Sequence, residues 1–321
     1  AVMTPTDKPA SQSNEVFCPY VKDILASRAF HPYRMADQYE QLQQTSGIDF
    51  SSCIRVLKLL PVFLDGTPHK SIRKQMALRM QATKADQEAA VIAQLDVLLA
   101  RHFGQSGEID LVDDFATPLW RSLSRSILQR DDALLNVVDD IPLLFFASLS
   151  LNKRKQINSA ITACIDKYGD EIIIDMALAS LGVKPFVGSL ALSFYDAIEK
   201  NCGRLLGTYT LGEKFGKSSL NFVDRIASQS IDVGGKTYAK GQRVRCVTQS
   251  SQYSDTENTG LLYGAGNHIC LGKAIAQFAL TYLNNACKQY PCVITPVSVH
   301  MLSDQEPFAM PKHLRVAINV N

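Results

Sequence analysis

Apolar residues recur every three to four positions over most of this chain, which is the spacing of one buried face on an amphipathic helix. The longest apolar helical stretch is 171–199, and another strongly helical run spans 273–289. Further predicted helical segments are 16–48, broken at Pro32, then 74–103 as one helix or two, 119–128, and pieces of 132–170. The pattern therefore predicts a mainly α fold.

Strand patterns are confined to short regions in the second half of the chain. Alternating apolar residues in 231–244, around two Gly-containing turns, predict a β-hairpin and a strand. Residues 291–320 are predicted to form C-terminal strands and loops. Residues 1–15 are polar and predicted to be disordered, so we expect a single domain over 16–321.

The composition is that of an ordinary globular protein and excludes several classes of function. The chain has 321 residues, of which 46% are hydrophobic and 20% charged, with a formal net charge of +2. No basic block with interleaved aromatic residues occurs, so nucleic acid is not an expected partner. No uninterrupted run of 18 or more apolar residues occurs, so a membrane-spanning helix is not expected.

The eight cysteines are scattered through apolar surroundings, and none forms a C-x-x-C pair. This usage favours reduced, mostly buried thiols in a cytoplasmic protein. A zinc site would need cysteines and histidines close together in the sequence, and such clusters are missing.

The most specific candidate chemistry lies in 263–276, which reads YGAGNHICLGKAIA. Glycines lead into a loop that carries Cys270, and a predicted helix follows. Glycine lets a backbone pass flat beneath a large planar ligand, and a helix N-terminus favours a thiolate. Both features suit a cysteine that ligates haem iron. The alternative is a buried structural cysteine beside a glycine-rich turn.

This stretch resembles the haem-binding loop of the cytochrome P450 superfamily, whose pattern is aromatic-Gly-x-Gly-x-His/Arg-x-Cys-x-Gly. Tyr263 stands where the family usually has Phe, and the other fixed positions match, among them Gly264, His268 and Gly272. The resemblance implies a P450-like fold with a small β part, haem b (iron protoporphyrin IX) as cofactor, and Cys270 as the axial ligand of the iron.

Three further residues resemble the family's propionate-binding positions. Residues 65–73 read DGTPHKSIR, which places His69 and Arg73 one turn apart on a predicted helix. This resembles the start of the P450 C helix, and Arg225 resembles the arginine that precedes the family's short hairpin. The resemblance implies that these residues, with His268, contact the haem propionates, because cations pair with carboxylates. The alternative for 69–73 is a solvated basic face.

The stretch 171–199 corresponds by its order to the family's long I helix, which usually carries an acid followed by Thr. Here Gly182 matches, whereas Lys184 replaces the acid and Pro185 replaces the alcohol. Proline inside a helix removes a hydrogen bond and kinks the helix. A basic residue followed by Pro resembles the fatty-acid peroxygenase branch, so we assign Gly182, Lys184 and Pro185 as candidate catalytic residues. The alternative is that Lys184 reaches solvent and Pro185 only kinks the helix.

Three regions depart from the family pattern. The segment between Leu128 and Glu171 is short, which predicts a truncated F/G lid. The expected E-x-x-R helix has only a weak candidate at 213–216, where the fourth residue is Gly216. The segment 247–262 is shorter than the family's meander.

The resemblance leaves three functions open. The first is a P450-like monooxygenase that oxidises a small or carrier-bound substrate in specialised metabolism. It would take electrons from a ferredoxin or reductase docked on the proximal face, near Lys70, Arg73 and Lys273. The second is a peroxygenase, isomerase or dehydratase that needs no redox partner. The third is an inactive haem-binding or scaffold protein.

Overall fold

A computed structural model describes residues 14–263, 268 and 270–321. Most of the predicted disordered segment 1–15, and Gly264 of the cysteine loop, lie outside the described residues. At the end of that segment Glu15 is already part of a strand, which pairs with residues 245–246.

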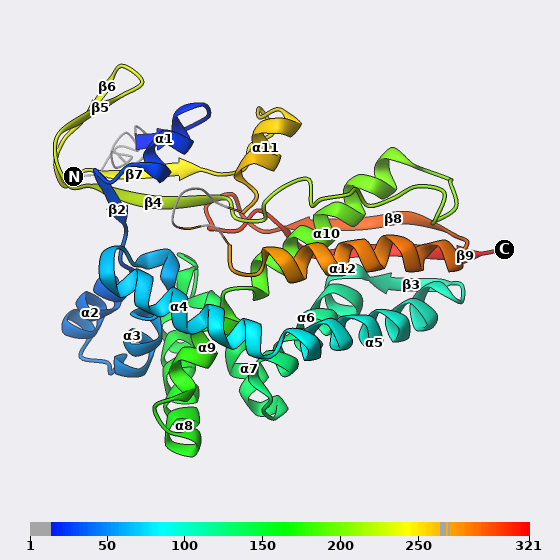
Figure 1. Cartoon of the computed structure of the whole chain (residues 1–321), viewed down its shortest axis with the longest axis horizontal. Helices are drawn as coiled ribbons and strands as arrows, with labels where there is room; N and C mark the ends of the chain where they lie inside the picture. Colours follow the sequence, from blue (N-terminus) through cyan, green and yellow to red (C-terminus); the bar gives the residue numbers. More distant parts are fainter. Residues whose placement is uncertain (1–13, 264–267, 269) are drawn as a thin grey trace, which may run out of the picture.

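Helices dominate the described chain, and the prediction of a mainly α fold is confirmed (Figure 1). The predicted run 74–103 is two helices, which meet at Thr83. The α-helices are α1 (Tyr20–Ala26), α2 (Met35–Ser46), α3 (Ser51–Leu57), α4 (Gly66–Ala82), α5 (Lys84–Phe103), α6 (Thr117–Leu128), α7 (Asp132–Asp140), α8 (Leu151–Tyr168), α9 (Ile172–Ser180), α10 (Val183–Lys200), α11 (Asp255–Leu261) and α12 (Lys273–Ala286). Shorter helical turns are η2 (Pro61–Phe63), the π-helical η3 (Leu111–Ala116), η4 (Ile141–Phe145) and η6 (Cys287–Gln289).

The β part consists of three small sheets. The four-stranded sheet has the order β1-β7-β4-β2, in which β1 and β7 are parallel and the other neighbours antiparallel. A three-stranded sheet has the order β3-β9-β8, and β5 pairs with β6 in the predicted hairpin. The strands are β1 (Glu15–Val16), β2 (Phe30–Pro32), β3 (Gly107–Asp110), β4 (Phe222–Ala227), β5 (Ile231–Val233), β6 (Lys236–Tyr238), β7 (Arg243–Val247), β8 (Cys292–Met301) and β9 (Pro311–Val320).

The main hydrophobic core lies among the helices, and an aromatic cluster marks its centre. Phe103 of α5, Phe115 of η3 and Phe194 of α10 are fully buried, with ring centroids 5.3–6.2 Å apart. Such offset and edge-to-face contacts add to the free energy gained by burying the rings. A second, smaller core joins α1 to the four-stranded sheet, which lies beside the helical part in Figure 1.

The stretch Ile172–Lys200 is long and apolar enough to cross a membrane, by length and composition alone, and no other stretch of the described chain meets those criteria. Within the fold, however, 72% of its most apolar window is buried. This degree of burial is typical of a helix in the core of a folded domain.

The expected continuous helix over 171–199 is wrong, because α9 ends at Ser180 and α10 begins at Val183. A Cβ added at Gly182 would lie 2.1 Å from the ring of Trp120, so the indole packs directly against this break. Pro185 lies in the first turn of α10, where its missing N–H would have had no partner within the helix. It therefore follows the break and does not kink a continuous helix.

Candidate active site

A cavity of about 430 Å³ lies between the helical part and the four-stranded sheet. Its walls combine segments from the whole chain: α4, the α9–α10 break, strands β4 and β7, the cysteine loop and the C-terminal loop. Most of the walls are apolar, including Phe63, Phe145, Phe186 and Phe308. The cavity is therefore suited to a large, mainly apolar group.

Cys270 opens onto this cavity. Its side chain is exposed and lines the wall, although the residue lies deep in the fold. The backbone N–H of Gly272 donates to Cys270 Sγ over 3.3 Å, and the Cys270 N–H donates to the Tyr263 carbonyl over 2.9 Å. Because Gly272 is the N-cap of α12, the sulfur sits at the positive end of a 14-residue helix.

Different groups around Cys270 shift the pKa of its thiol in opposite directions. Burial raises the pKa of the thiol, whereas the Gly272 N–H, the Arg73 guanidinium and the Lys273 N–H favour the thiolate. A metal ion requires the deprotonated sulfur and would reinforce those favourable contacts. The site therefore has the donors that a thiolate ligand needs.

Tyr263 carries the aromatic ring at the start of the loop. Burial and the nearby Cys270 raise the pKa of its hydroxyl to about 12, and this hydroxyl has no hydrogen-bond partner in the described chain. Lys273 Nζ lies 5.4 Å from the ring centroid. The phenol therefore stays neutral and packs as an aromatic wall, as Phe would.

The structure brings His69 and His268 into contact. Their ring centroids are 4.2 Å apart, with an interplanar angle of 32°. His69 is only 3% exposed, and its Nε2 has no hydrogen-bond partner in the described chain. Burial and the neighbouring cations lower the pKa of both imidazoles, to about 3 for His268.

Arg73 and Arg225 complete this cluster of cationic and imidazole groups. Arg225 is 4% exposed, and its Nη1 donates to the Asp224 carbonyl over 3.1 Å. Both arginines depress the pKa of His69 and His268, which places the four groups close together. No ion pair in the described chain joins any of the four to a carboxylate.

Two guanidiniums without an ion pair in the described chain, next to an imidazole nitrogen without a hydrogen-bond partner there, favour the binding of an anionic group. A group with two carboxylates, such as haem, would supply acceptors for His69 Nε2 and for both guanidiniums. The residues present therefore fit the cofactor implied by the sequence.

Comparison with known proteins identifies the fold. A scan against protein-family models finds no match, and a search of curated proteins finds none either. Among solved structures, epothilone D-bound cytochrome P450epoK aligns with a TM-score of 0.70 at 14% identity, over 94% of this chain and 89% of that one. P450 RauA, in complex with a biosynthetic intermediate of aurachin RE, aligns at 0.69 and 17% identity, over 94% and 89%. P450BioI, in complex with a hexadec-9Z-enoic acid-ligated acyl carrier protein, aligns at 0.69 and 16% identity, over 92% and 89%. This chain has the cytochrome P450 fold.

In this P450 fold, Gly182 and Pro185 line the cavity together with Ser180 and Ser189. The described lining residues of α9 and α10 include no carboxylic acid and no threonine. The Ser180 hydroxyl donates to the Ala177 carbonyl over 3.0 Å. The usual acid–alcohol pair of the family is thus missing from this wall.

Lys184 is placed differently from its two neighbours. It is not among the lining residues of the described chain. Burial lowers the pKa of its ammonium, while the carboxylates of Asp139 and Asp140 in α7 favour the charged form. Its ammonium therefore lies near α7, and its assignment as a catalytic residue stays a prediction.

The departures from the P450 pattern also have structural counterparts. Residues 201–221 contain turns and isolated bridges but no helix, so the E-x-x-R candidate at 213–216 lies in irregular chain. Between α6 and α9 the chain forms only α7, η4 and α8, in agreement with a truncated lid. Residues 144–147, at the end of η4, line the cavity directly.

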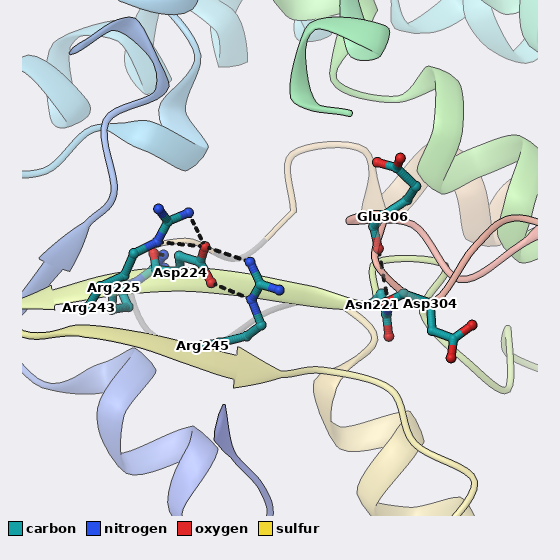
Figure 2. Close-up of polar contacts among 7 residues, drawn as sticks. All are labelled: Asn221, Asp224, Arg225, Arg243, Arg245, Asp304 and Glu306. Carbon is teal, nitrogen blue, oxygen red and sulfur yellow. Dashed lines mark hydrogen bonds and ion pairs between the residues drawn. The ribbon is translucent and has the colours of Figure 1, made fainter. Parts of the chain in front are cut away.

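Sequence reasoning missed a second charged group on the cavity wall. Asp224 of β4 lies between Arg243 and Arg245 of β7, and all three line the cavity (Figure 2). The sequence feature that could have predicted this charged group is the spacing of Arg243 and Arg245, because residues two apart in a strand lie on the same face. Their joint partner, Asp224, became visible only from the register of the two strands.

Proposed function

We propose that this protein is a haem-thiolate oxidoreductase with Cys270 as the axial ligand. The observation that carries the proposal is the position of the Cys270 thiol. It opens onto the cavity near Arg73, one of four arginine and histidine side chains that form no ion pair with a carboxylate in the described chain. The fold and the cysteine loop support the same assignment.

Each residue has a specific task in this proposal. His69, Arg73, Arg225 and His268 hold the two propionates, while the N–H groups of Gly272 and Lys273 stabilise the thiolate. Tyr263 packs as a neutral wall, and Gly264, which lies outside the described residues, keeps the role implied by the loop motif. Haem, if bound by these residues, would supply the redox chemistry.

The absorption spectrum of the reduced protein under carbon monoxide tests the ligand assignment. The wild-type protein should give the red-shifted band of thiolate-bound haem, and Cys270→Ser should abolish it. Cys202→Ser is the matched control, because Cys202 is an exposed cysteine outside the cavity wall. A thiolate band that survives in Cys270→Ser would assign the ligand to another cysteine.

The wall at α9 and α10 favours a second candidate, in which the enzyme works without external electrons. The described lining residues of these helices lack the acid and threonine that deliver protons during dioxygen activation in the family. Peroxygenase, isomerase or dehydratase chemistry does not need that pair. Turnover with peroxide, compared with turnover under dioxygen with a surrogate ferredoxin and reductase, separates this candidate from a monooxygenase.

We further propose a small or carrier-tethered substrate from specialised metabolism, consistent with the acyl carrier protein bound to P450BioI. If electrons are required, a ferredoxin or reductase would dock near Lys70, Arg73 and Lys273. The scattered reduced cysteines favour a cytoplasmic location.

A further inference from the structure

Asp224 of β4 is shared by two arginines of β7. Arg243 donates to Asp224 Oδ2 from Nε over 3.0 Å and from Nη2 over 2.5 Å. Arg245 donates from Nε to Oδ1 over 3.1 Å and from Nη2 to Oδ2 over 3.3 Å. The Asp224 side chain is only 7% exposed, so its ion pairs with the two arginines are shielded from solvent.

This group carries a net positive charge and keeps free donors. Two guanidiniums against one carboxylate leave one formal positive charge. In the described chain, neither Arg243 Nη1 nor Arg245 Nη1 has a hydrogen-bond partner, although each guanidinium has five N–H donors. An anionic oxygen group would supply both the acceptors and the missing charge.

Aromatic rings hold the two guanidiniums in place. Arg243 Cζ lies 3.9 Å from the ring centroid of Tyr33, and Arg245 Cζ lies 3.6 Å from that of Phe222. Planar guanidiniums stack well on aromatic faces, and stacking limits their conformational freedom. The donors are therefore oriented before any ligand arrives.

The arginine pair is separate from the four groups assigned to the propionates. Asp224 is directly opposite Arg245 in the β4–β7 register, and Arg225 is opposite Val244. Since side chains alternate along a strand, Asp224, Arg243 and Arg245 share one face of the sheet and Arg225 belongs to the other. Figure 2 shows both arginine side chains flanking Asp224 on the same side of the strands.

We propose that Arg243 and Arg245 bind an anionic oxygen group, a carboxylate or a phosphate ester, on the substrate of this enzyme. The apolar walls beyond the pair, with Met35, Phe63 and Phe145, would then take an apolar body. The substrate class is thus an amphipathic acid. This inference rests on the proposed function, because it concerns the substrate of the same cavity.

Isothermal titration calorimetry of the haem-loaded protein tests the proposal with three probes of equal chain length: decanoate, decyl phosphate and decanol. The wild-type protein should bind at least one anion roughly tenfold more tightly than the alcohol, as expected for a charge-assisted hydrogen bond. The tighter of the two anions identifies the headgroup. Arg243→Gln and Arg245→Gln should each remove most of this preference.

Two further variants and two further measurements separate charge from packing. Arg245→Lys keeps the charge but loses the planar stack, so it should retain part of the preference for the anion. Arg28→Gln removes an exposed arginine outside the cavity wall and should change nothing. Haem occupancy and melting temperature should stay near wild type in Arg243→Gln, whose arginine side chain is 47% exposed.

Equal binding of the alcohol and both anions by the wild-type protein would overturn the proposal. Loss of haem in the Arg243 and Arg245 variants, with an unchanged preference among the probes, would also overturn it by assigning the pair to the cofactor. A wild-type protein that takes up no haem would refute the proposed function instead. The same titration of that haem-free protein would still decide whether anions bind at the arginine pair.

Discussion

At the scale of single residues, the groups around Cys270 are best understood as an incomplete set of charges. Arg73 and Arg225 each lower the pKa of His69 and of His268, and His69 also lowers that of His268. Without a bound anionic ligand, the protein would be more stable if some of these four residues were neutral. Their presence together therefore indicates a ligand that carries negative charge.

Arg73→Ala should weaken haem retention. A charge-assisted hydrogen bond is worth about 1.5–3 kcal/mol, so haem affinity should fall roughly ten- to a hundredfold. The rate of haem transfer to an excess of apomyoglobin measures the change. Lys74→Ala is the control, because Lys74 is an exposed cation on the same helix. Equal haem loss in both variants would remove Arg73 from the propionate site.

The pKa of His268 predicts a pH dependence for the stability of the haem-free protein. The folded value is about 3, against an ordinary value of 6.5, because burial and nearby cations disfavour the imidazolium. The unfolded chain takes up this proton first, so the contribution is complete above pH 6.5 and is lost as pH falls towards 3. Below 6.5 the free energy of unfolding should decrease by about 1.4 kcal/mol per pH unit from this group.

Urea unfolding at about pH 7.5 and about pH 5.5 measures this dependence. In His268→Gln the loss of stability on acidification should be smaller than in wild type by about 1 kcal/mol. His300→Gln, which changes an exposed histidine of β8, should behave as wild type does. An identical pH dependence in all three proteins would show that His268 does not carry the effect.

At the scale of elements, the break between α9 and α10 brings Gly182 into direct contact with Trp120. A Cβ at position 182 would lie within 2.8 Å of three ring atoms of Trp120, and a rigid indole cannot yield as a flexible side chain does. Gly182→Ala should therefore destabilise the protein by about 1–3 kcal/mol, the usual cost of overpacking. Thermal unfolding measures this change.

Three variants check the explanation. Gly216→Ala should be nearly neutral, because no atom lies within 4 Å of the added Cβ. Trp120→Leu should relieve the clash, so the double variant Trp120→Leu, Gly182→Ala should be more stable than the sum of the two single changes predicts. Simple additivity would mean that Gly182 is needed for another reason.

At the scale of the whole molecule, the cavity is closed by segments that are far apart in the sequence. Glu306 of the C-terminal loop is 4% exposed and accepts hydrogen bonds from the N–H groups of Ala147 and Ser148, over 3.0 Å and 3.2 Å. Residues 144–147 and Gln305, Pro307 and Phe308 all line the cavity, and the rings of Phe146 and Phe308 lie 5.8 Å apart. This carboxylate therefore ties the two parts of the wall together.

Glu306→Ala should loosen both segments, because two backbone N–H groups would lose a charged acceptor in a partly buried place. We expect faster hydrogen exchange at 144–149 and 303–308, with a smaller effect in the aromatic core around Phe115. Asp304→Ala is the matched control, since Asp304 is an exposed acid of the same loop. Unchanged exchange at 144–149 would mean that Glu306 does not hold this part of the wall.

The sequence by itself determined the features that depend on short stretches of chain. The helical segments follow from apolar spacing, and the cysteine loop follows from a fixed order of glycine, histidine and cysteine before a helix. His69 and Arg73 could be paired in advance because one helical turn brings them to the same face. These features are local, so no knowledge of long-range contacts was needed to find them.

The tertiary structure alone decided which distant side chains meet. It brought Arg225 and His268 beside His69, placed Lys184 near the carboxylates of α7, and turned Arg243 and Arg245 towards Asp224. The need for glycine at position 182 likewise depends on Trp120, some sixty residues earlier in the chain. The direction of a side chain and the fit of an indole are set by packing across the fold, and the spacing of residues along the chain carries no information about either.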